Sequence, residues 1–227
     1  MTPFDQALHD YYYHEDETEF VLHNDYGDPE DMPVEVLFRL VPTELEEYAL
    51  TWCKGHVLDI GAGVGVHSLF LQHVEQRVTA LEVSSKACQI MADRGVVNIL
   101  NQSMYAPLPQ KYDTLLMLMN GLGLCGTIAN VPHFFNTLKA MLNPGGYVVA
   151  DSSDVAYMFE ELPAERYYGE VRFCYEYKHL IGEWFDWLYI DPEYLQKLAR
   201  ENGWSCEVVF DDGYDQYLAL LKPDNYD

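Results

Sequence analysis

An aspartate and three glycines lie at regular spacing in the segment VLDIGAGVG, residues 57–65. Asp59 stands two residues before Gly61, and a glycine then occupies every second position up to Gly65. Glycines allow a tight backbone turn and let a ligand approach without Cβ atoms in the way. A turn that needs glycine only for its dihedral angles would need one, so three alternating glycines predict a ligand-binding loop.

The charges around this loop indicate which ligand it binds. A dinucleotide-binding loop has the spacing G-x-G-x-x-G and holds a pyrophosphate, but here Val66 breaks that spacing and Asp59 would repel a pyrophosphate. Glu82 ends the next apolar run, where a carboxylate can accept hydrogen bonds from both hydroxyls of a ribose. A ligand with a ribose, a cationic group and no phosphate fits both acids, and S-adenosylmethionine is such a molecule.

Alternating strands and helices are needed to position these residues. Apolar runs predict strands at 56–61, 77–82, 96–100, 112–120 and 147–151, and helices are predicted at 42–55, 64–74, 84–95, 131–142 and 191–204. Thr43 and Glu46 have the spacing of a capping box at the start of the first of these helices. The alternation predicts an α/β fold with a parallel sheet, whose ligand crevice lies at the carboxyl ends of the strands. Two last strands within 205–223 are joined by a turn too short for a parallel crossover, so they pair antiparallel.

Two aromatic segments fall outside this alternation. Residues 1–41 predict a short helix and two extended pieces, and residues 169–190 predict a β-hairpin. The insertion 152–190 begins directly after the fifth strand, so we expect it to form the substrate-side wall, with Tyr175, Trp184 and Trp187 as substrate contacts. The alternatives are that the hairpin is a packing layer, and that the N-terminal segment packs without covering the crevice.

Composition excludes several classes of protein. The chain has 227 residues, which suits one α/β domain with additions, and its 13 basic and 37 acidic residues give a net charge of -24. Nucleic acid and anionic membranes are therefore poor partners. Five dispersed cysteines without a C-x-x-C motif predict free thiols and no metal site. No signal peptide or run of about 18 apolar residues is found, so we expect a cytoplasmic protein; the oligomeric state is left open.

Four segments carry a resemblance to a known family. In chain order, VLDIGAGVG, ALEVS, YDTLLMLMN and LNPGGYVV resemble the motifs of class I S-adenosylmethionine-dependent methyltransferases, over roughly residues 43 to 221, and the fuller pattern is similar to a bacterial branch. The resemblance implies a Rossmann-like seven-stranded sheet, mostly parallel with an antiparallel last strand, to which the β-hairpin is added. It divides the chain into an extension over the active site, 1–41, and a methyltransferase domain, 42–227, which contains the insertion 152–190.

The resemblance also implies which residues bind S-adenosylmethionine. Residues at the loop would line its methionine end, Glu82 would hold the ribose, two residues after the third strand would contact the adenine, and two at the end of the fourth strand would lie beside the transferred methyl. In order, these cofactor-binding residues are Asp59, Gly61, Ala62, Gly63, Glu82, Val83, Gln102, Ser103, Asn120 and Gly121.

Methyl transfer itself asks little of catalytic side chains. The sulfonium is already activated, so the protein positions and desolvates the reactants, and a general base is needed only if the nucleophile arrives protonated. Asn120 and Asp151 are the candidate catalytic residues, although Asn120 could instead cap a turn and Asp151 could be a surface acid. The predicted function is methyl transfer to an oxygen or nitrogen of a small molecule, with a protein acceptor as second choice. The alternatives are a non-catalytic S-adenosylmethionine-binding protein and an NAD-dependent oxidoreductase.

Overall fold

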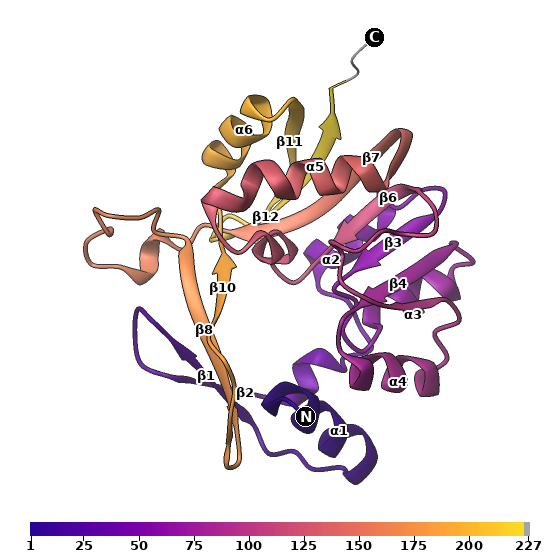
Figure 1. Ribbon diagram of the computed structural model, residues 1–227, viewed down its shortest axis with the longest axis vertical. Coiled ribbons are helices and arrows are strands. Elements are labelled where there is room, and N and C mark those ends of the chain that lie inside the picture. The colour runs from indigo at the N-terminus through magenta and orange to yellow at the C-terminus, as the bar shows by residue number, and fades with distance from the viewer. Residues whose placement is uncertain (225–227) are drawn as a thin grey trace.

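The computed structural model describes residues 1–224 and contains one large sheet of seven strands (Figure 1). The strand order is β11-β12-β7-β6-β3-β4-β5. The strands are β3 (Val57–Ile60), β4 (Val78–Glu82), β5 (Ile99–Asn101), β6 (Tyr112–Met117), β7 (Leu142–Ser153), β11 (Trp204–Asp211) and β12 (Gln216–Pro223). Strands β3 to β7 pair in parallel, whereas β12 is antiparallel to both β7 and β11. The predicted Rossmann-like sheet with an antiparallel last strand is confirmed.

Helices cover both faces of this sheet. Each strand alternates its side chains between the two faces, and the apolar side chains on each face are buried under a helix. Leu58, Leu115 and Val148 pack under α5 (Val131–Met141) and α6 (Pro192–Glu201). Their neighbours Val57, Leu116 and Val149 pack under α2 (Glu44–Thr51) and α3 (Val66–His73), and α4 (Ser85–Arg94) lies beside β4 and β5. None of the described helices has the length and apolarity needed to cross a bilayer.

A second, smaller sheet contains the predicted hairpin. Its strands are β1 (Phe20–Asn24), β2 (Glu30–Met32), β8 (Glu170–Tyr177), β9 (Leu180–Ile181) and β10 (Phe185–Leu188), in the antiparallel order β10-β8-β1-β2 with β9 beside β8. The hairpin β8–β10 is thus present, and it pairs with an N-terminal strand, which the sequence analysis did not predict. Helix α1 (Pro3–His14) packs against β8 and α4, so the N-terminal segment links the two sheets (Figure 1).

Within residues 1–224 there are also four short 3₁₀ turns: η1 (Val34–Leu37), η2 (Gly121–Cys125), η3 (Ile128–Asn130) and η4 (Ala156–Met158). Turn η2 follows β6 and contacts both β7 and β10. It therefore lies where the large sheet meets the hairpin, directly after the strand end at which the sequence predicts the methyl-transfer site.

Glu46 joins three segments at the start of α2. The predicted capping box is present, since Thr43 Oγ1 accepts from the Glu46 N–H and Glu46 Oε2 accepts from the Thr43 N–H at 2.7 Å. Glu46 Oε1 also accepts from Arg39 and, at 3.1 Å, from His67 Nε2 of α3. Burial alone would raise the pKa of Glu46, but these hydrogen bonds and the charges of His67 and Arg39 lower it to about 2.

We expect Glu46→Gln to destabilise the protein in a pH-dependent way. Because the folded-state pKa of Glu46 is depressed, to about 2, its carboxylate adds stability that is complete above about pH 5 and is lost as the pH falls toward 2. Urea unfolding should show a larger deficit for the variant at neutral pH than near pH 3. Glu47→Gln, an exposed change on the same helix, is the control. An equal deficit at both pH values would contradict this role.

Candidate active site

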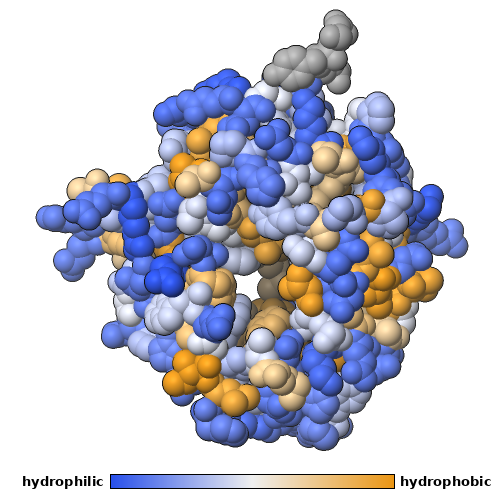
Figure 2. Space-filling model, in the orientation of Figure 1, coloured by the Kyte–Doolittle hydropathy of each residue, from blue (hydrophilic) through white to orange (hydrophobic). Residues whose placement is uncertain are grey.

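A cavity of about 530 Å³ lies between the carboxyl ends of β3, β4 and β6 and the second sheet. Its lining combines residues 59–64 of the glycine loop, Val66, His67, Glu82 and residues 118–121 with side chains from α1, β1, β2, β8 and β10. The hollow near the middle of the face in Figure 2 has hydrophobic side chains at its rim. Cavities of this size, largely apolar and with a few polar groups, are typical of small-molecule sites.

The three glycines of the loop have two different roles. All three have a positive φ, of 72°, 54° and 86° for Gly61, Gly63 and Gly65. A Cβ atom at position 63 would meet no atom within 4 Å, whereas one at position 65 would lie 2.8 Å from Val96 and 2.9 Å from Met91. Gly61 and Gly63 line the cavity and leave it open to a ligand, while Gly65 lets the start of α3 pack against α4 and the segment that follows it.

Asp59 is buried beneath the loop, with 2% of its surface exposed. Ser68 Oγ donates to its Oδ2 at 2.7 Å. Burial raises the pKa of Asp59, and the charge of His67 and the hydrogen bond from Ser68 act in the opposite direction. Burial would lower the pKa of His67, but the hydrogen bond to Glu46 and the charges of Asp59 and Glu46 outweigh it and raise the pKa. A cation beside Asp59 therefore favours its ionised form.

Glu82 lies at the end of β4, on the other side of the loop. Its Oε2 accepts from the Gly63 N–H at 2.9 Å and its Oε1 from the Ser84 N–H at 2.8 Å. Burial raises the pKa of Glu82, while these N–H groups act to lower it. Each carboxylate oxygen has a second lone pair, so both can still accept a hydrogen bond from a ligand in the cavity.

Three of the predicted cofactor residues lie outside the cavity lining. Val83 has 69% of its surface exposed. Gln102 Nε2 donates to the Pro107 carbonyl at 3.3 Å, and Ser103 Oγ accepts from the Tyr105 N–H at 3.2 Å. The two polar side chains are thus used within the loop that follows β5.

The backbone at the end of β6 is held in an unusual conformation. Met119 and Asn120 both have a positive φ, of 63° and 59°, which costs of order 1–3 kcal/mol per residue and is common at functional sites. Asn120 lines the cavity, and its Oδ1 accepts from Ser153 Oγ at 2.9 Å. Asp151 accepts from the Gly121 N–H at 3.0 Å, and burial raises its pKa to about 6. Asp151 lies behind Gly121 rather than on the cavity surface, so the structure places it as a support of the backbone.

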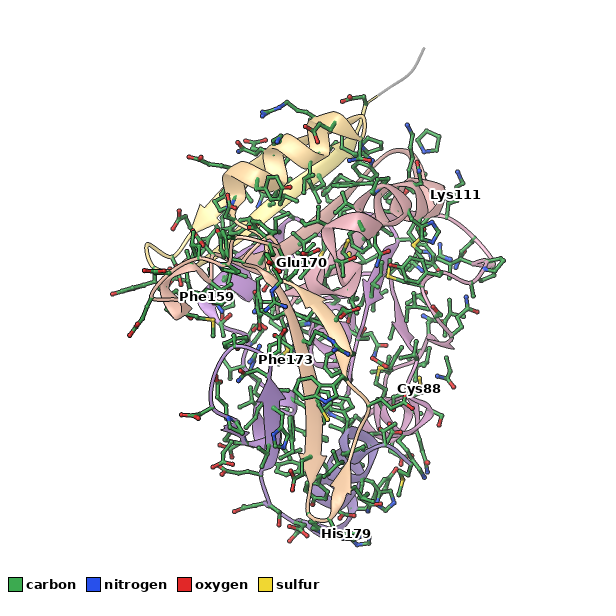
Figure 3. The ribbon with its side chains drawn as sticks, turned by 60° about the vertical axis from the view of Figure 1, so that its left-hand side comes forward. Cys88, Lys111, Phe159, Glu170, Phe173 and His179 are labelled. Atoms are coloured by element: carbon green, nitrogen blue, oxygen red, sulfur yellow. The ribbon has the colours of Figure 1, made fainter. Side chains whose placement is uncertain are left out.

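Five aromatic side chains from the hairpin region line the side of the cavity opposite the glycine loop: Phe173, Tyr175, Phe185, Trp187 and Tyr189. We call them the aromatic wall. The ring centroids of Tyr175 and Phe185 lie 5.3 Å apart, those of Phe173 and Tyr189 6.3 Å, and those of Phe185 and Trp187 6.4 Å. Figure 3 shows Phe173 on β8. Trp187 packs so closely on η2 that a Cβ atom at Gly123 would lie 2.0 Å from its indole.

The structure separates the two tryptophans that the sequence grouped together. Trp187 lies in the aromatic wall, but Trp184 is 47% exposed outside the cavity, with the Arg172 guanidinium 5.7 Å from its ring centre. A strand alternates its side chains, and 185, 187 and 189 share a parity that 184 lacks. This alternation groups Phe185 and Tyr189 with Trp187 and leaves Trp184 out.

The N-terminal segment supplies five further side chains of the cavity, which the sequence analysis did not name. They are Phe4, Leu8, Leu22, Met32 and Leu37. Phe4 stacks on Tyr175 of the aromatic wall, with 5.2 Å between ring centroids. The pairing of β1 with β8 helps to bring this segment to the cavity, and no local sequence signal predicts that pairing.

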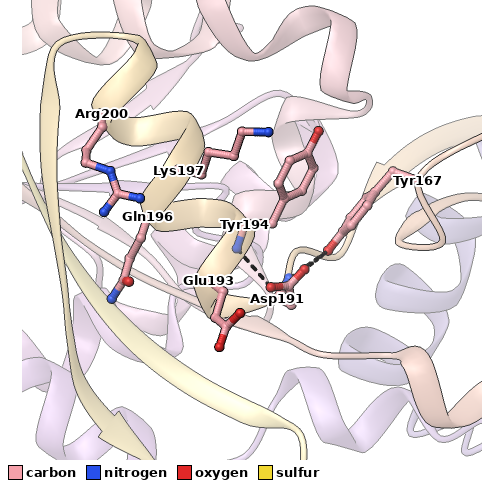
Figure 4. Close-up of a pocket in the computed structure, with 7 residues that line it drawn as sticks. All are labelled: Tyr167, Asp191, Glu193, Tyr194, Gln196, Lys197 and Arg200. Atoms are coloured by element: carbon pink, nitrogen blue, oxygen red, sulfur yellow. Dashed lines mark hydrogen bonds between the residues drawn. The ribbon is translucent and has the colours of Figure 1, made fainter.

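A second hollow, at the start of α6, is built from side chains that bond to one another (Figure 4). Asp191 caps the helix by accepting from the Tyr194 N–H at 2.9 Å, and its other oxygen accepts from the Tyr167 hydroxyl at 2.7 Å. These contacts fix the helix start, and none of the predicted site residues lies there.

A cluster of possible metal ligands lies on α1, away from the cavity. One ligand atom each of His9, Asp10 and His14 lie within 4.8 Å of one another. The Lys178 ammonium, 2.8 Å from Asp10 Oδ2, already neutralises the carboxylate of this cluster, so it carries no functional assignment.

Comparisons of the sequence and the fold with those of known proteins show the family of this chain. A family described as a methyltransferase domain matches residues 35–208. A crystal structure of an S-adenosylmethionine-dependent methyltransferase from Bacteroides fragilis, in complex with S-adenosylhomocysteine, is 36% identical in sequence. It superposes with a TM-score of 0.93 over 98% of this chain and 95% of that chain.

The chain belongs to the S-adenosylmethionine-dependent methyltransferases. More distant methyltransferases share its fold. The CcbJ methyltransferase from Streptomyces caelestis is 16% identical, with a TM-score of 0.62 over 81% of this chain and 91% of that chain. The glycopeptide N-methyltransferase MtfA, complexed with S-adenosylmethionine, is 17% identical, with a TM-score of 0.55 over 79% and 92%. No curated protein matches the sequence significantly.

S-adenosylmethionine is the cofactor of this methyltransferase, and the residues at the loop suit it. The open position at Gly63 leaves room for a ligand against the backbone. Asp59 and Glu82 offer carboxylates on either side, while Lys and Arg are absent from the described lining of the cavity. This donor set matches a ligand with an ammonium group and ribose hydroxyls and no phosphate.

We expect alanine at Gly63 and at Gly65 to have different consequences. Both substitutions carry the same kind of backbone cost at positive φ. Gly63→Ala should weaken S-adenosylhomocysteine binding, measured by calorimetry, because its methyl group occupies ligand space. Gly65→Ala should instead add about 1–3 kcal/mol of overpacking and lower the melting temperature further. The role assigned to Gly63 fails if its alanine variant binds as tightly as wild type.

We further expect Glu82→Ala to weaken S-adenosylhomocysteine binding by about 1.5–3 kcal/mol, the range for a hydrogen bond to a charged group. Glu82→Gln keeps the side-chain shape and one acceptor, so it should lose less. Calorimetry on variants whose melting curves remain cooperative measures both effects. Unchanged affinity in a folded Glu82→Ala protein would show that this carboxylate does not hold the cofactor.

Proposed function

We propose that this methyltransferase transfers a methyl group to a nitrogen or oxygen of a small molecule bound between the glycine loop and the aromatic wall. The observation that carries the proposal is the placement of both features on opposite sides of one cavity of about 530 Å³. We assign the acceptor side to the N-terminal segment 1–41 and the insertion 152–190, and the cofactor side to the strands of the large sheet. The mainly apolar character of the acceptor side supports a small, largely apolar acceptor.

The chain's own residues account for binding, orientation and exclusion of water. We assign Asp59 and residues 61–63 to the methionine end of the cofactor, Glu82 to the ribose, and Asn120 with Gly121 to the region of the transferred methyl. When bound, S-adenosylmethionine supplies a methyl group on a positively charged sulfonium. The aromatic wall removes water from the acceptor side, and positioning of this kind supplies most of what a displacement at carbon requires.

Charge and geometry weigh against larger acceptors. With 13 basic and 37 acidic residues, the protein would repel a phosphate backbone, so we do not propose a nucleic-acid acceptor. A protein acceptor would have to insert a side chain between two sheets and α1, and it stays the second choice. A screen with labelled cofactor against a metabolite panel and against protein extracts separates the two.

We expect Trp187→Ala to keep cofactor affinity and to lose methyl transfer to the acceptor found in that screen by at least about tenfold, since its indole lies on the acceptor side. Trp184→Ala removes the same side chain from an exposed position outside the cavity, so it is the matched control and should retain activity. If both variants lose activity in proportion to a lower melting temperature, the hairpin is a packing layer and not the acceptor site.

A further inference from the structure

The described lining of the cavity carries negative charge and lacks the cations that would hold an anion. Asp59 and Glu82 are its carboxylates, and His67, already bonded to Glu46, is its one basic side chain. On the aromatic side of the cavity, a carboxylate, phosphate or phenolate would lose its hydration without gaining an ion pair from a protein side chain, which is costly. The acceptor that this cavity favours is therefore neutral or cationic as it enters.

The described lining also lacks a free general base. Asp59 accepts from Ser68 and lies beneath the loop, Glu82 is assigned to the ribose of the cofactor, and His67 is bonded to Glu46. Asp151 lies behind Gly121, outside the lining. An alcohol is a poor nucleophile until a base removes its proton. An amine differs, because it can release its extra proton to water before it reaches the cofactor and then presents a neutral lone pair.

The aromatic wall suits a nitrogen that becomes positively charged. Tyr175 and Tyr189 line the cavity, and neither hydroxyl makes a hydrogen bond to another residue within 1–224. Burial raises the pKa of Tyr175 to about 12, so this hydroxyl stays neutral and can accept from an N–H group. Aromatic faces attract ammonium groups, and the rings of Phe185 and Trp187 lie on the same side of the cavity.

From these contacts we propose that the methyl acceptor is a primary or secondary amine on an apolar body, bound against the aromatic wall; the inference rests on the proposed small-molecule function. The nitrogen lone pair forms the bond to the methyl carbon. The carbon–sulfur bond breaks with its electron pair remaining on sulfur. The methylated nitrogen carries the positive charge until it releases one proton to water.

Matched acceptors that share a carbon skeleton test this proposal. One set is 2-phenylethylamine, 2-phenylethanol and 3-phenylpropanoate, and a second is hexylamine, hexanol and heptanoate. Calorimetry on the full chain loaded with S-adenosylhomocysteine measures binding, and mass spectrometry after incubation with S-adenosylmethionine measures methylation. We expect the amine of at least one set to bind about tenfold or more tighter than its carboxylate partner, and only amines to be methylated.

Variants locate the effect in the aromatic wall. Tyr175→Phe/Tyr189→Phe removes both unpaired hydroxyls without removing a ring, and it should weaken amine binding several-fold. Tyr214→Phe removes a hydroxyl from a residue that is 92% exposed in the C-terminal hairpin, and should change nothing. Equal amine affinity in the double variant and wild type would contradict the claim that these two hydroxyls bind the amine.

The outcomes distinguish this inference from the proposed function. Methylation of an alcohol or carboxylate, or tighter binding of the carboxylates, would overturn the amine assignment while leaving small-molecule methyl transfer in place. Failure of both amines to bind at millimolar concentration, while S-adenosylhomocysteine binds, would also overturn it. Methylation of a protein in an extract, with every small molecule inert, would instead overturn the proposed function.

Discussion

A buried group of alternating charges holds together the segments that form this methyltransferase site. Asp59, at the end of β3, is removed from water, and an isolated carboxylate there would cost several kcal/mol. His67 from α3 offsets that charge and is bonded to Glu46 from α2, which in turn pairs with Arg39 after η1. Because the four side chains come from four separate segments, the charge balance fixes the N-terminal segment relative to the glycine loop. Removal of His67 would leave the buried Asp59 carboxylate without a neighbouring positive charge, so the cofactor side of the cavity depends on this group.

The two sides of the cavity are built in different ways, and this difference matters for function. The cofactor side consists of strand ends and the turns that follow them, so its residues are close in sequence and its geometry follows from the parallel sheet. The acceptor side is assembled from α1, the pair β1–β2 and the hairpin β8–β10, which are far apart in the chain. Local constraints therefore shape the side of the cavity that we assign to S-adenosylmethionine, while long-range packing shapes the side that we propose for the acceptor.

Sequence reasoning succeeded where the physics is local. Strand β3, which contains Asp59, forms a single unit with the glycine turn and helix α3 that follow it. The capping box of Thr43 and Glu46 is fixed by spacing alone. It fell short where contacts span the chain: His23 of β1 bonds to Glu176 of β8, 153 residues away, and no periodicity indicates that pairing. Trp184 was grouped with Trp187 by composition, although the alternation of a strand places the two apart. The resemblance implies Gln102 and Ser103 as adenine contacts; their side chains bond within their own loop, and the assignment stays a prediction.

A crystal structure of the protein with S-adenosylhomocysteine tests the central claim most directly, namely that one cavity holds the cofactor on its glycine side and the acceptor on its aromatic side. We predict that the amino-acid end of the ligand lies against residues 61–63, that both ribose hydroxyls bond to Glu82, and that the sulfur faces Asn120 and the aromatic wall. A ligand whose adenine stacks on Trp187 or Tyr189, with its sulfur turned away from the wall, would contradict the account.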